Sequence, residues 1–343
     1  MVNKKNIFSA PYKTSRDWLY TPSTYLLDSY TPSVEEIFLP RTETKPCKLI
    51  LTYSEKGKAS YQSQTFFGKI KSRLFTDSIR FSKGVLIDLR DYSPQNLAHA
   101  VMIHLPIALM AKDFLKDLGK GSPILVLPDS LPKYIEVMFE ELGFDLLLTN
   151  DAIIGEVCDY DIDVLVGMRG LIPSILKSSL EETKFSKKIF KISEGMPKKI
   201  FLSRKDSRCL KNELEVELFL KEKGYQKVYM EDYSVLEQLS MVSLADSIVA
   251  VHGAALGVLV LRHVFTVKPV EFIELFSPAH MTNVYRVVTH QIGGKWVGVR
   301  GKLWPALIDI AYSRNAKNIH EGAFLDFEIC LLSLERALLK VSE

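Results

Sequence analysis

The chain has 343 residues, which is enough for two domains of ordinary size, each with its own hydrophobic core. A hydrophobic share of 47% and a charged share of 25% are typical of a soluble globular protein. The formal net charge of +3 is too small to indicate nucleic-acid binding, so we expect no nucleic-acid partner.

Cysteine spacing and the polar N-terminus indicate the expected compartment. The four cysteines are far apart and show no Cys-x-x-Cys or Cys/His ligand spacing, which argues against a structural zinc site. Residues 1–6 are polar, with no apolar signal core behind them. No run of about 18 apolar residues is present, and residues 245–267 come closest. We therefore expect a cytoplasmic protein without a transmembrane helix.

The first half of the chain has the pattern of an α/β domain. Residues 1 to about 45 lack a clear period, so we expect an irregular or weakly extended segment wrapped on the N-terminal domain. Short apolar runs then predict strands at 48–53, 84–89, 123–127, 145–149 and 161–166. Helical periods predict helices at about 93–118, 131–142 and 171–182. We expect Ser93 to cap the first of these, and Pro106 to kink it. The alternation predicts a parallel sheet covered on both faces.

A second α/β domain follows a change in composition. Residues 184–199 mix charges with Ser, Gly and Pro, which predicts a linker and gives domains 1–190 and 191–343. Strands are predicted at 200–202, 227–229 and 247–251, and helices at 212–224 and 234–244. We expect the helix at 212–224 to bury Leu214, Leu218 and Phe219. A closing amphipathic helix is predicted at 324–341, with Phe327, Leu331, Leu334 and Leu338 on one face.

Arg204 and Arg208 follow a predicted strand, where α/β proteins place ligands outside the carboxyl ends of their strands. The planar guanidinium binds phosphate oxygens bidentately, so this pair suits a diphosphate. A solvated basic loop is the alternative, because Lys205 lies between the two arginines.

A second candidate site segment is the turn His252-Gly253-Ala254-Ala255 after strand 247–251. Its small residues let the backbone turn sharply and bring a helix N-terminus close to a phosphate. His252 could hydrogen-bond or protonate a leaving phosphate, or be a satisfied core residue. Glu274 ends the next strand and could hold ribose hydroxyls, or be a surface carboxylate.

These elements, in this order, resemble the family 61 glycosyltransferases, the DUF563 group. The resemblance spans about residues 199–276 and is carried by Arg204-x-x-x-Arg208, Asn212-Glu213, Glu237-Gln238, His252-Gly253-Ala254 and Glu274-Leu275. The family pattern usually continues after His-Gly-Ala with Gly-Leu-Thr-Asn, whereas this chain has Ala255-Leu256-Gly257-Val258. This departure leaves the identity of the nucleotide sugar open.

The resemblance implies an α/β fold of two Rossmann-like domains that face a cleft, the GT-B type. Domain 1–190 would be the acceptor side and domain 191–343 the nucleotide-sugar side, with the last helix packing back on the first domain. Family members are inverting enzymes, and UDP is the default donor nucleotide. Asn212, Glu213 and Gln238 are expected to support the site by capping a helix and fixing a loop. No cofactor or metal is expected, since cations and helix N-termini can replace a metal at the diphosphate.

In the first domain, Asn96-Leu97-Ala98-His99 with Leu105-Pro106 resembles the Asn-x-x-His and Leu-Pro pattern of bacterial relatives. The pKa of an ordinary histidine lies near working pH, so His99 is the first choice for the base that deprotonates the acceptor. Asp91 and Asp88 are rivals at a strand end. The alternatives are that His99 only orients other residues and that Asp88 bonds its own loop.

We therefore expect an inverting, metal-independent glycosyltransferase that adds a sugar to an oligo- or polysaccharide in bacterial capsule or surface polysaccharide synthesis. A lipid-linked acceptor would bring the protein to the membrane surface. Two alternatives stay open: a nucleotide-sugar epimerase or hydrolase, and a protein that binds glycan or nucleotide without turnover.

Overall fold

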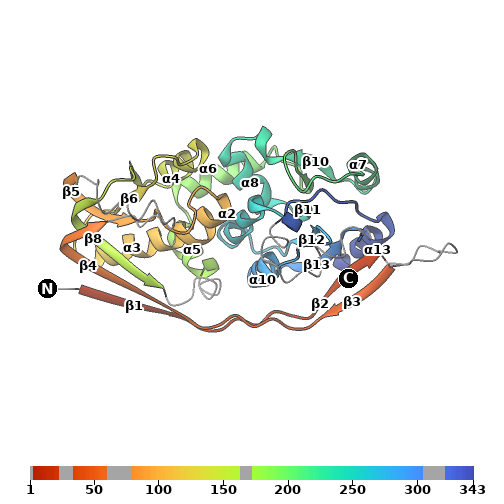
Figure 1. Ribbon diagram of the computed structural model, residues 1–343, viewed down its shortest axis with the longest axis horizontal. Helices are drawn as coiled ribbons and strands as arrows, with labels where there is room; N and C mark the ends of the chain where they lie inside the picture. Colours follow the sequence, from red (N-terminus) through yellow and green to blue (C-terminus); the bar gives the residue numbers. More distant parts are fainter. Residues whose placement is uncertain (1–2, 23–33, 60–78, 163–171, 304–320) are drawn as a thin grey trace. The chain divides into compact units, whose positions relative to one another are not determined.

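The computed structural model describes residues 3–22, 34–59, 79–162, 172–303 and 321–343. The chain forms two compact units, each with its own sheet (Figure 1). Unit 1 comprises Met1–Tyr12 and Thr44–Lys188, and unit 2 comprises Lys13–Glu43 and Ile189–Glu343. The chain therefore passes between the units three times, and the last passage lies close to the boundary expected at 190/191.

Unit 1 is built on a six-stranded sheet in the order β1-β4-β8-β5-β6-β7. The strands are β1 (Asn3–Ser9), β4 (Cys47–Ala59), β5 (Ile79–Asp88), β6 (Ile124–Leu127), β7 (Asp145–Leu148) and β8 (Ile153–Ile162). β8, β5, β6 and β7 are parallel, whereas β4 and β1 are antiparallel additions. The chain moves outward from β5 through β6 and β7 and returns to the other side of β5 as β8. Most of the strand expected at 161–166 lies outside the described residues.

The helices of unit 1 are α2 (Leu97–His99), the π-helical turn η1 (Ala100–His104), α3 (Leu105–Asp117), α4 (Lys133–Glu141) and α5 (Ile172–Leu180). The first three form one helix of 21 residues, Leu97–Asp117. Its length and composition would suffice to cross a membrane, but 78% of its most apolar window is buried inside the protein, as in a core helix. No other described helix meets that test.

Two local expectations for this helix are corrected by the structure. Asn96 rather than Ser93 is its cap, because the Asn96 side chain accepts a hydrogen bond from the Ala98 N–H at 2.9 Å. Pro106 lies in the first turn of α3 and does not break the helix. The irregularity is instead the π-helical turn just before it, a kind of turn that often occurs at functional sites.

His104, in that turn, is completely buried and makes stability depend on pH. Burial lowers the pKa of His104 to about 4, so between about pH 6.5 and 4 the unfolded chain binds a proton that the folded chain does not. The free energy of unfolding should therefore fall by up to about 3 kcal/mol as the pH drops through this range. Urea unfolding measured against pH should show this loss shrinking in His104→Leu. An unchanged loss would contradict the prediction; His99→Gln, in the same helix, is the control.

Unit 2 is built on a seven-stranded sheet in the order β10-β9-β11-β12-β13-β2-β3. The strands are β9 (Lys199–Ser203), β10 (Gln226–Tyr229), β11 (Ser247–Val251), β12 (Glu271–Phe276), β13 (Lys295–Arg300), β2 (Asp17–Pro22) and β3 (Val34–Leu39). All but β3 are parallel. Continuous apolar runs such as Ser247–Val251 suit parallel strands because both faces of the sheet are covered.

The expectation that the N-terminal segment lies on the first domain holds for its start, since Asn3–Ser9 form β1 of unit 1, and is wrong for the residues that follow. Residues 13–43 belong to unit 2, where β2 pairs with β13 through Trp18 and Val297. Buried Asp17 fixes the segment by accepting hydrogen bonds from Arg286 Nε at 2.5 Å and His290 Nε2 at 2.8 Å. Both partners lie on α10 (Val284–Gln291).

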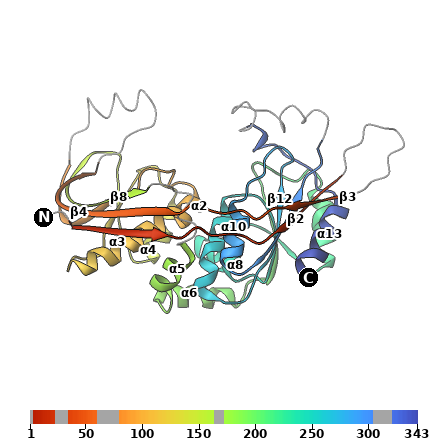
Figure 2. The same ribbon diagram turned by 90° about the horizontal axis from the view of Figure 1, so that it is seen from below.

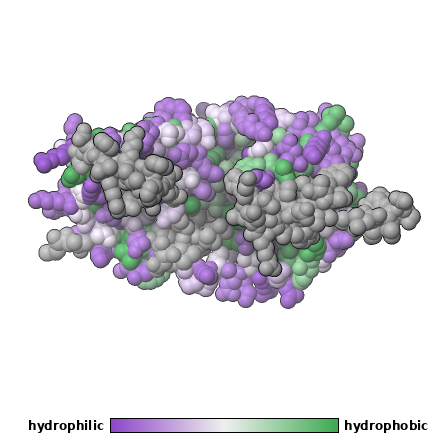
Figure 3. Space-filling view, viewed as in Figure 1, coloured by the Kyte–Doolittle hydropathy of each residue, from purple (hydrophilic) through white to green (hydrophobic). Residues whose placement is uncertain are grey.

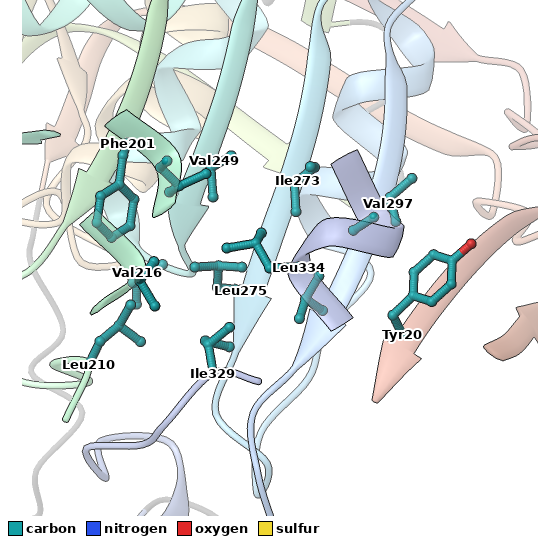
Figure 4. Close-up of a cluster of buried hydrophobic side chains, with 14 of the residues drawn as sticks. Tyr20, Phe201, Leu210, Val216, Val249, Ile273, Leu275, Val297, Ile329 and Leu334 are labelled. Carbon is teal, nitrogen blue, oxygen red and sulfur yellow. The ribbon is translucent and has the colours of Figure 1, made fainter. Parts of the chain in front are cut away.

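The core of unit 2 lies between the sheet and its helices. Inward-facing residues of four adjacent strands, Phe201, Val249, Ile273 and Val297, meet residues of α7 (Glu213–Glu222) and α13 (Leu331–Ser342) (Figure 4). α13 packs on β13, β2 and β12 of its own unit, and its expected packing on the first domain stays a prediction (Figure 2). On the face shown in Figure 3, hydrophilic side chains predominate among the described residues.

Two further sequence expectations fail locally. α7 buries Val216 and Leu220, whereas Leu214 and Leu218 are 68% and 55% exposed. The expected linker at 184–199 begins with helix α6 (Lys184–Ser193), so charge and Ser content were misleading there.

Candidate anion-binding site

The unit 2 site lies where the strand order reverses. β10 follows β9 in the chain and pairs with one side of it, whereas β11 pairs with the other side. At such a reversal the loops leave in opposite directions and open a crevice beyond the carboxyl ends of the strands. Arg204 follows β9 directly, and His252 follows β11. The fold thus brings together two segments that are about fifty residues apart in the sequence.

Arg204 lies directly against Gly253. Its Nε donates to the Ser207 carbonyl at 2.8 Å, which fixes the guanidinium above the turn. A Cβ built on Gly253 would lie 2.1 Å from Arg204 Nη1, so no side chain fits between them. Glycine is needed here for the close approach, since its φ of −178° is open to any residue.

Arg208 is the second cation of the crevice. Its backbone has a positive φ of 58°, an uncommon conformation for a residue other than glycine. The segment after residue 320 holds it there: the Arg208 N–H donates to the Phe324 carbonyl at 3.3 Å, and Asp326 accepts from the Cys209 N–H at 2.8 Å. The guanidinium lies over the Phe324 ring, 5.3 Å from its centroid. A strained residue that is held this firmly is a candidate for function.

The two arginines lack carboxylate partners among the described residues, where neither forms an ion pair. Arg208 Nε is buried without a hydrogen-bond partner in that part of the chain. Burial, and to a smaller extent Arg204, lower the pKa of Arg208 to about 10, so it stays cationic at neutral pH. Two neighbouring, unneutralised guanidiniums favour binding of an anion.

His252 is held by a buried carboxylate. Its Nδ1 lies 2.6 Å from Glu274 Oε1, and the other oxygen of Glu274 accepts from Trp296 Nε1 at 2.8 Å. Because the carboxylate accepts, Nδ1 carries the hydrogen and Nε2 is left for a ligand. Glu274 is fully buried, so it has no exposed oxygen for a ribose, and it is not a surface carboxylate either. It orients the imidazole instead, as a buried charge with two partners.

Aromatic side chains surround the His252 ring. Phe276 stacks on it at 5.5 Å between centroids, and Tyr285 and His280 lie at 5.3 Å and 5.9 Å.

Ala254 and Ala255 follow in the 3-10 helix η4 (Ala254–Leu261), whose first N–H groups have no partner within the helix. The site can therefore offer guanidinium, imidazole and backbone N–H donors to one anion.

Asn212, Glu213 and Gln238 make contacts that fix the surrounding structure. Asn212 Nδ2 donates to the Ile329 carbonyl at 2.9 Å, and Glu213 accepts from the Tyr229 hydroxyl at 2.8 Å. Gln238, on α8 (Val235–Leu244), donates to the Tyr233 carbonyl at 3.0 Å. All three thus bond to neighbouring segments.

The contact between Gly253 and Arg204 gives a testable prediction. Gly253→Ala should lower the affinity for a nucleoside diphosphate about tenfold, because the new methyl group displaces the guanidinium. Stability should change little, since Arg204 is half-buried and can move. Calorimetric titration and thermal unfolding separate the two effects. Gly195→Ala, where a Cβ meets nothing within 4 Å, is the control, and equal losses in both variants would refute the prediction.

Unit 1 has a pocket at its own strand reversal, beyond the carboxyl ends of β5 and β8. It encloses about 230 Å³, and its lining includes Asp88, Asp91, Tyr92, Asp159, Tyr160 and Asp161. Asp88 is paired with buried Arg90, whose Nη2 lies 2.7 Å from Oδ2. Desolvation, and to a smaller extent Asp88, raise the pKa of Asp91, as suits a general base.

His99 lies beside this pocket's loop. Its Nδ1 is 2.9 Å from the Tyr92 carbonyl, which can only accept, so Nδ1 carries the hydrogen and Nε2 is a proton acceptor. Asn96 caps the helix that carries His99. Both candidate bases thus lie in unit 1.

Two other findings concern ligands. No group of three or more His, Cys, Asp or Glu side chains that could hold a metal ion is present among the described residues. A second pocket, of about 310 Å³, is lined in part by Lys199 and Glu271, at the amino ends of β9 and β12. It therefore lies at the opposite end of these strands from the crevice.

Comparison with known proteins gives one family. Residues 167–261 match the family model of Glycosyltransferase 61. The match covers less than a third of the chain and includes Arg204, Arg208 and His252, but it ends before Glu274. No curated protein matches the chain. The match thus supports the resemblance to this family, while the roles of the individual residues stay predictions.

Sequence reasoning missed Trp296, Tyr285 and His280. Trp296 carries no motif, and its role depends on β12 and β13 being neighbours. Tyr285 and His280 come from the segment after β12, which no pattern connected with the arginines.

Proposed function

We propose that the chain is an inverting, metal-independent glycosyltransferase that moves a sugar from a nucleotide-sugar donor to a glycan acceptor. The observation that carries the proposal is the pair of arginines beside His252 at the strand reversal, without carboxylate partners among the described residues. The match to Glycosyltransferase 61 supports a transferase. Under this proposal unit 2 is the donor side, unit 1 is the acceptor side, and the two Rossmann-like units face a cleft as in the GT-B type.

In the proposed reaction the acceptor hydroxyl attacks the anomeric carbon while the bond to the diphosphate breaks. His99 or Asp91 takes the hydroxyl proton, and the leaving diphosphate keeps the bonding electron pair. Arg204 and Arg208 neutralise the charge that develops on the diphosphate, and His252 Nε2 lies where it can bond a phosphate oxygen. The guanidiniums thus supply the charge that a metal ion would otherwise supply.

We further propose a UDP-sugar donor, a cytoplasmic location and an acceptor in bacterial surface polysaccharide synthesis, with membrane contact through a lipid-linked acceptor. These finer assignments rest on the resemblance alone. A binder without turnover is the second candidate, because Gly257 and Val258 stand where the family pattern has Thr-Asn, and both are buried.

Release of nucleoside diphosphate from a panel of nucleotide sugars tests the function. A transferase releases it only when an acceptor saccharide is added, whereas a hydrolase releases it with water alone. An epimerase releases none but changes the sugar, and a binder leaves the donor intact. If release needs an acceptor, His99→Gln and Asp91→Asn identify the base. The variant that still binds the donor but no longer transfers the sugar is the one in which the base has been replaced.

A further inference from the structure

His280 lies in the loop between β12 and α10, held in a fixed turn. Its backbone N–H donates to the Ser277 carbonyl at 3.2 Å, and the Ser277 hydroxyl donates to the Gly322 carbonyl at 3.1 Å. The His280 ring is half-buried and lies 5.9 Å from the His252 ring, tilted by 60°. No hydrogen bond to the His280 ring is formed within the described residues. The imidazole therefore lies at the crevice, next to the groups that would hold a diphosphate.

The charged and titratable groups that act on His280 come from two elements. Arg208 comes from the loop after β9 and His252 from the end of β11, where His252 also contacts Tyr285 of α10. Burial lowers the pKa of His280, and the nearby His252 and Arg208 lower it further. No carboxylate among the described residues opposes this effect. His280 is therefore neutral at pH 7 while the site is empty.

We propose that His280 is a further phosphate-binding residue of this site and that it takes up a proton from solvent when a diphosphate binds. The proposal rests on the donor site proposed above. The bound anion reverses the local field, because it brings negative charge next to His252 and Arg208, the two groups that otherwise disfavour a proton on His280. The imidazolium then donates to a phosphate oxygen and returns its proton to solvent when the diphosphate leaves.

Proton uptake predicts that diphosphate binds more tightly at lower pH. Linkage allows at most about one proton per site, and therefore at most about a tenfold change in affinity per pH unit. Inorganic pyrophosphate is the probe, titrated by calorimetry between about pH 6 and 8 in two buffers of different ionisation enthalpy. The probe's own protonation is common to all variants and cancels when they are compared.

The wild type and three variants separate the roles. The wild type should take up more protons than His280→Gln, and its affinity advantage over this variant should disappear toward pH 8. His280→Lys carries a permanent charge, so its affinity should stay high at pH 8 without the extra uptake. His252→Gln should weaken binding at every pH and leave the extra uptake in place. Thermal unfolding without probe shows whether each variant is folded.

The outcomes distinguish this proposal from the donor site itself. Equal proton uptake in the wild type and His280→Gln overturns the role of His280 while the donor site stands. Loss of the extra uptake in His252→Gln, with retention in His280→Gln, assigns the proton to His252 and also overturns it. If pyrophosphate binds none of the proteins at any pH, the donor site and the role of His280 both fall.

Discussion

Arg204→Ala and Arg208→Ala should each lower the affinity for a nucleoside diphosphate about 10- to 100-fold, since a charge-assisted hydrogen bond contributes about 1.5–3 kcal/mol. The double variant should bind too weakly to measure. The physical reason is that neither guanidinium has a carboxylate partner within the described residues, so both charges are available to the ligand. Calorimetric titration with UDP and GDP measures the loss.

Lys205 provides a matched control because it lies in the same loop. Its ammonium pairs with Asp232 and is exposed, so Lys205→Ala should change the affinity less than about twofold. If Lys205→Ala weakens binding as much as the arginine variants do, the segment is only a solvated basic loop. Lysine at position 204 or 208 should restore part of the affinity, because it keeps the charge without the bidentate fork.

Arg262→Ala should destabilise the protein by about 3–5 kcal/mol. Arg262 is 1% exposed and begins α9 (Arg262–Phe265), the helix that continues η4 away from the crevice. Its guanidinium donates to four carbonyls, those of Ser243, Ala245, Lys268 and Pro269. Removing it leaves a cavity and unpaired buried acceptors between the end of α8 and the start of β12.

Urea unfolding followed by circular dichroism measures this loss. Arg262→Lys should be intermediate, because an ammonium reaches fewer carbonyls than the guanidinium does. Lys221→Ala, an exposed cation on α7, should stay within about 0.5 kcal/mol of the wild type. A loss in Arg262→Ala no larger than that of Lys221→Ala would contradict the structural role of Arg262.

The sequence could predict the elements whose signal is local. Residues 247–251 are a continuous apolar run followed by small residues, and they form β11 and the turn at Gly253. Ser234 and Glu237 form a capping box at the start of α8, which is also a local pattern. The position of Arg204 directly after a predicted strand is also confirmed, and the role of the two arginines at a phosphate stays a prediction.

Features that depend on distant partners could not be predicted. β2 is a strand of unit 2 because β13, almost three hundred residues later, offers it an edge. The burial of Glu274 depends on His252 and Trp296, which come from two other segments. The buried face of α7 was misread because Leu214 and Leu218 follow a helical period, although the sheet covers Val216 and Leu220.

The most direct test of the central claim is thermal unfolding with a panel of UDP, GDP, CMP and their sugars, with EDTA present. A nucleotide at about 100 times its Kd should add nearly 3 kcal/mol of apparent stability. We expect at least one nucleotide to stabilise the wild type despite EDTA, and to stabilise Arg204→Ala by only about 0.4–1.4 kcal/mol at the same concentration, because its affinity is about 10- to 100-fold lower. If none stabilises the protein at millimolar concentration, unit 2 does not hold a metal-independent donor site and the account is wrong.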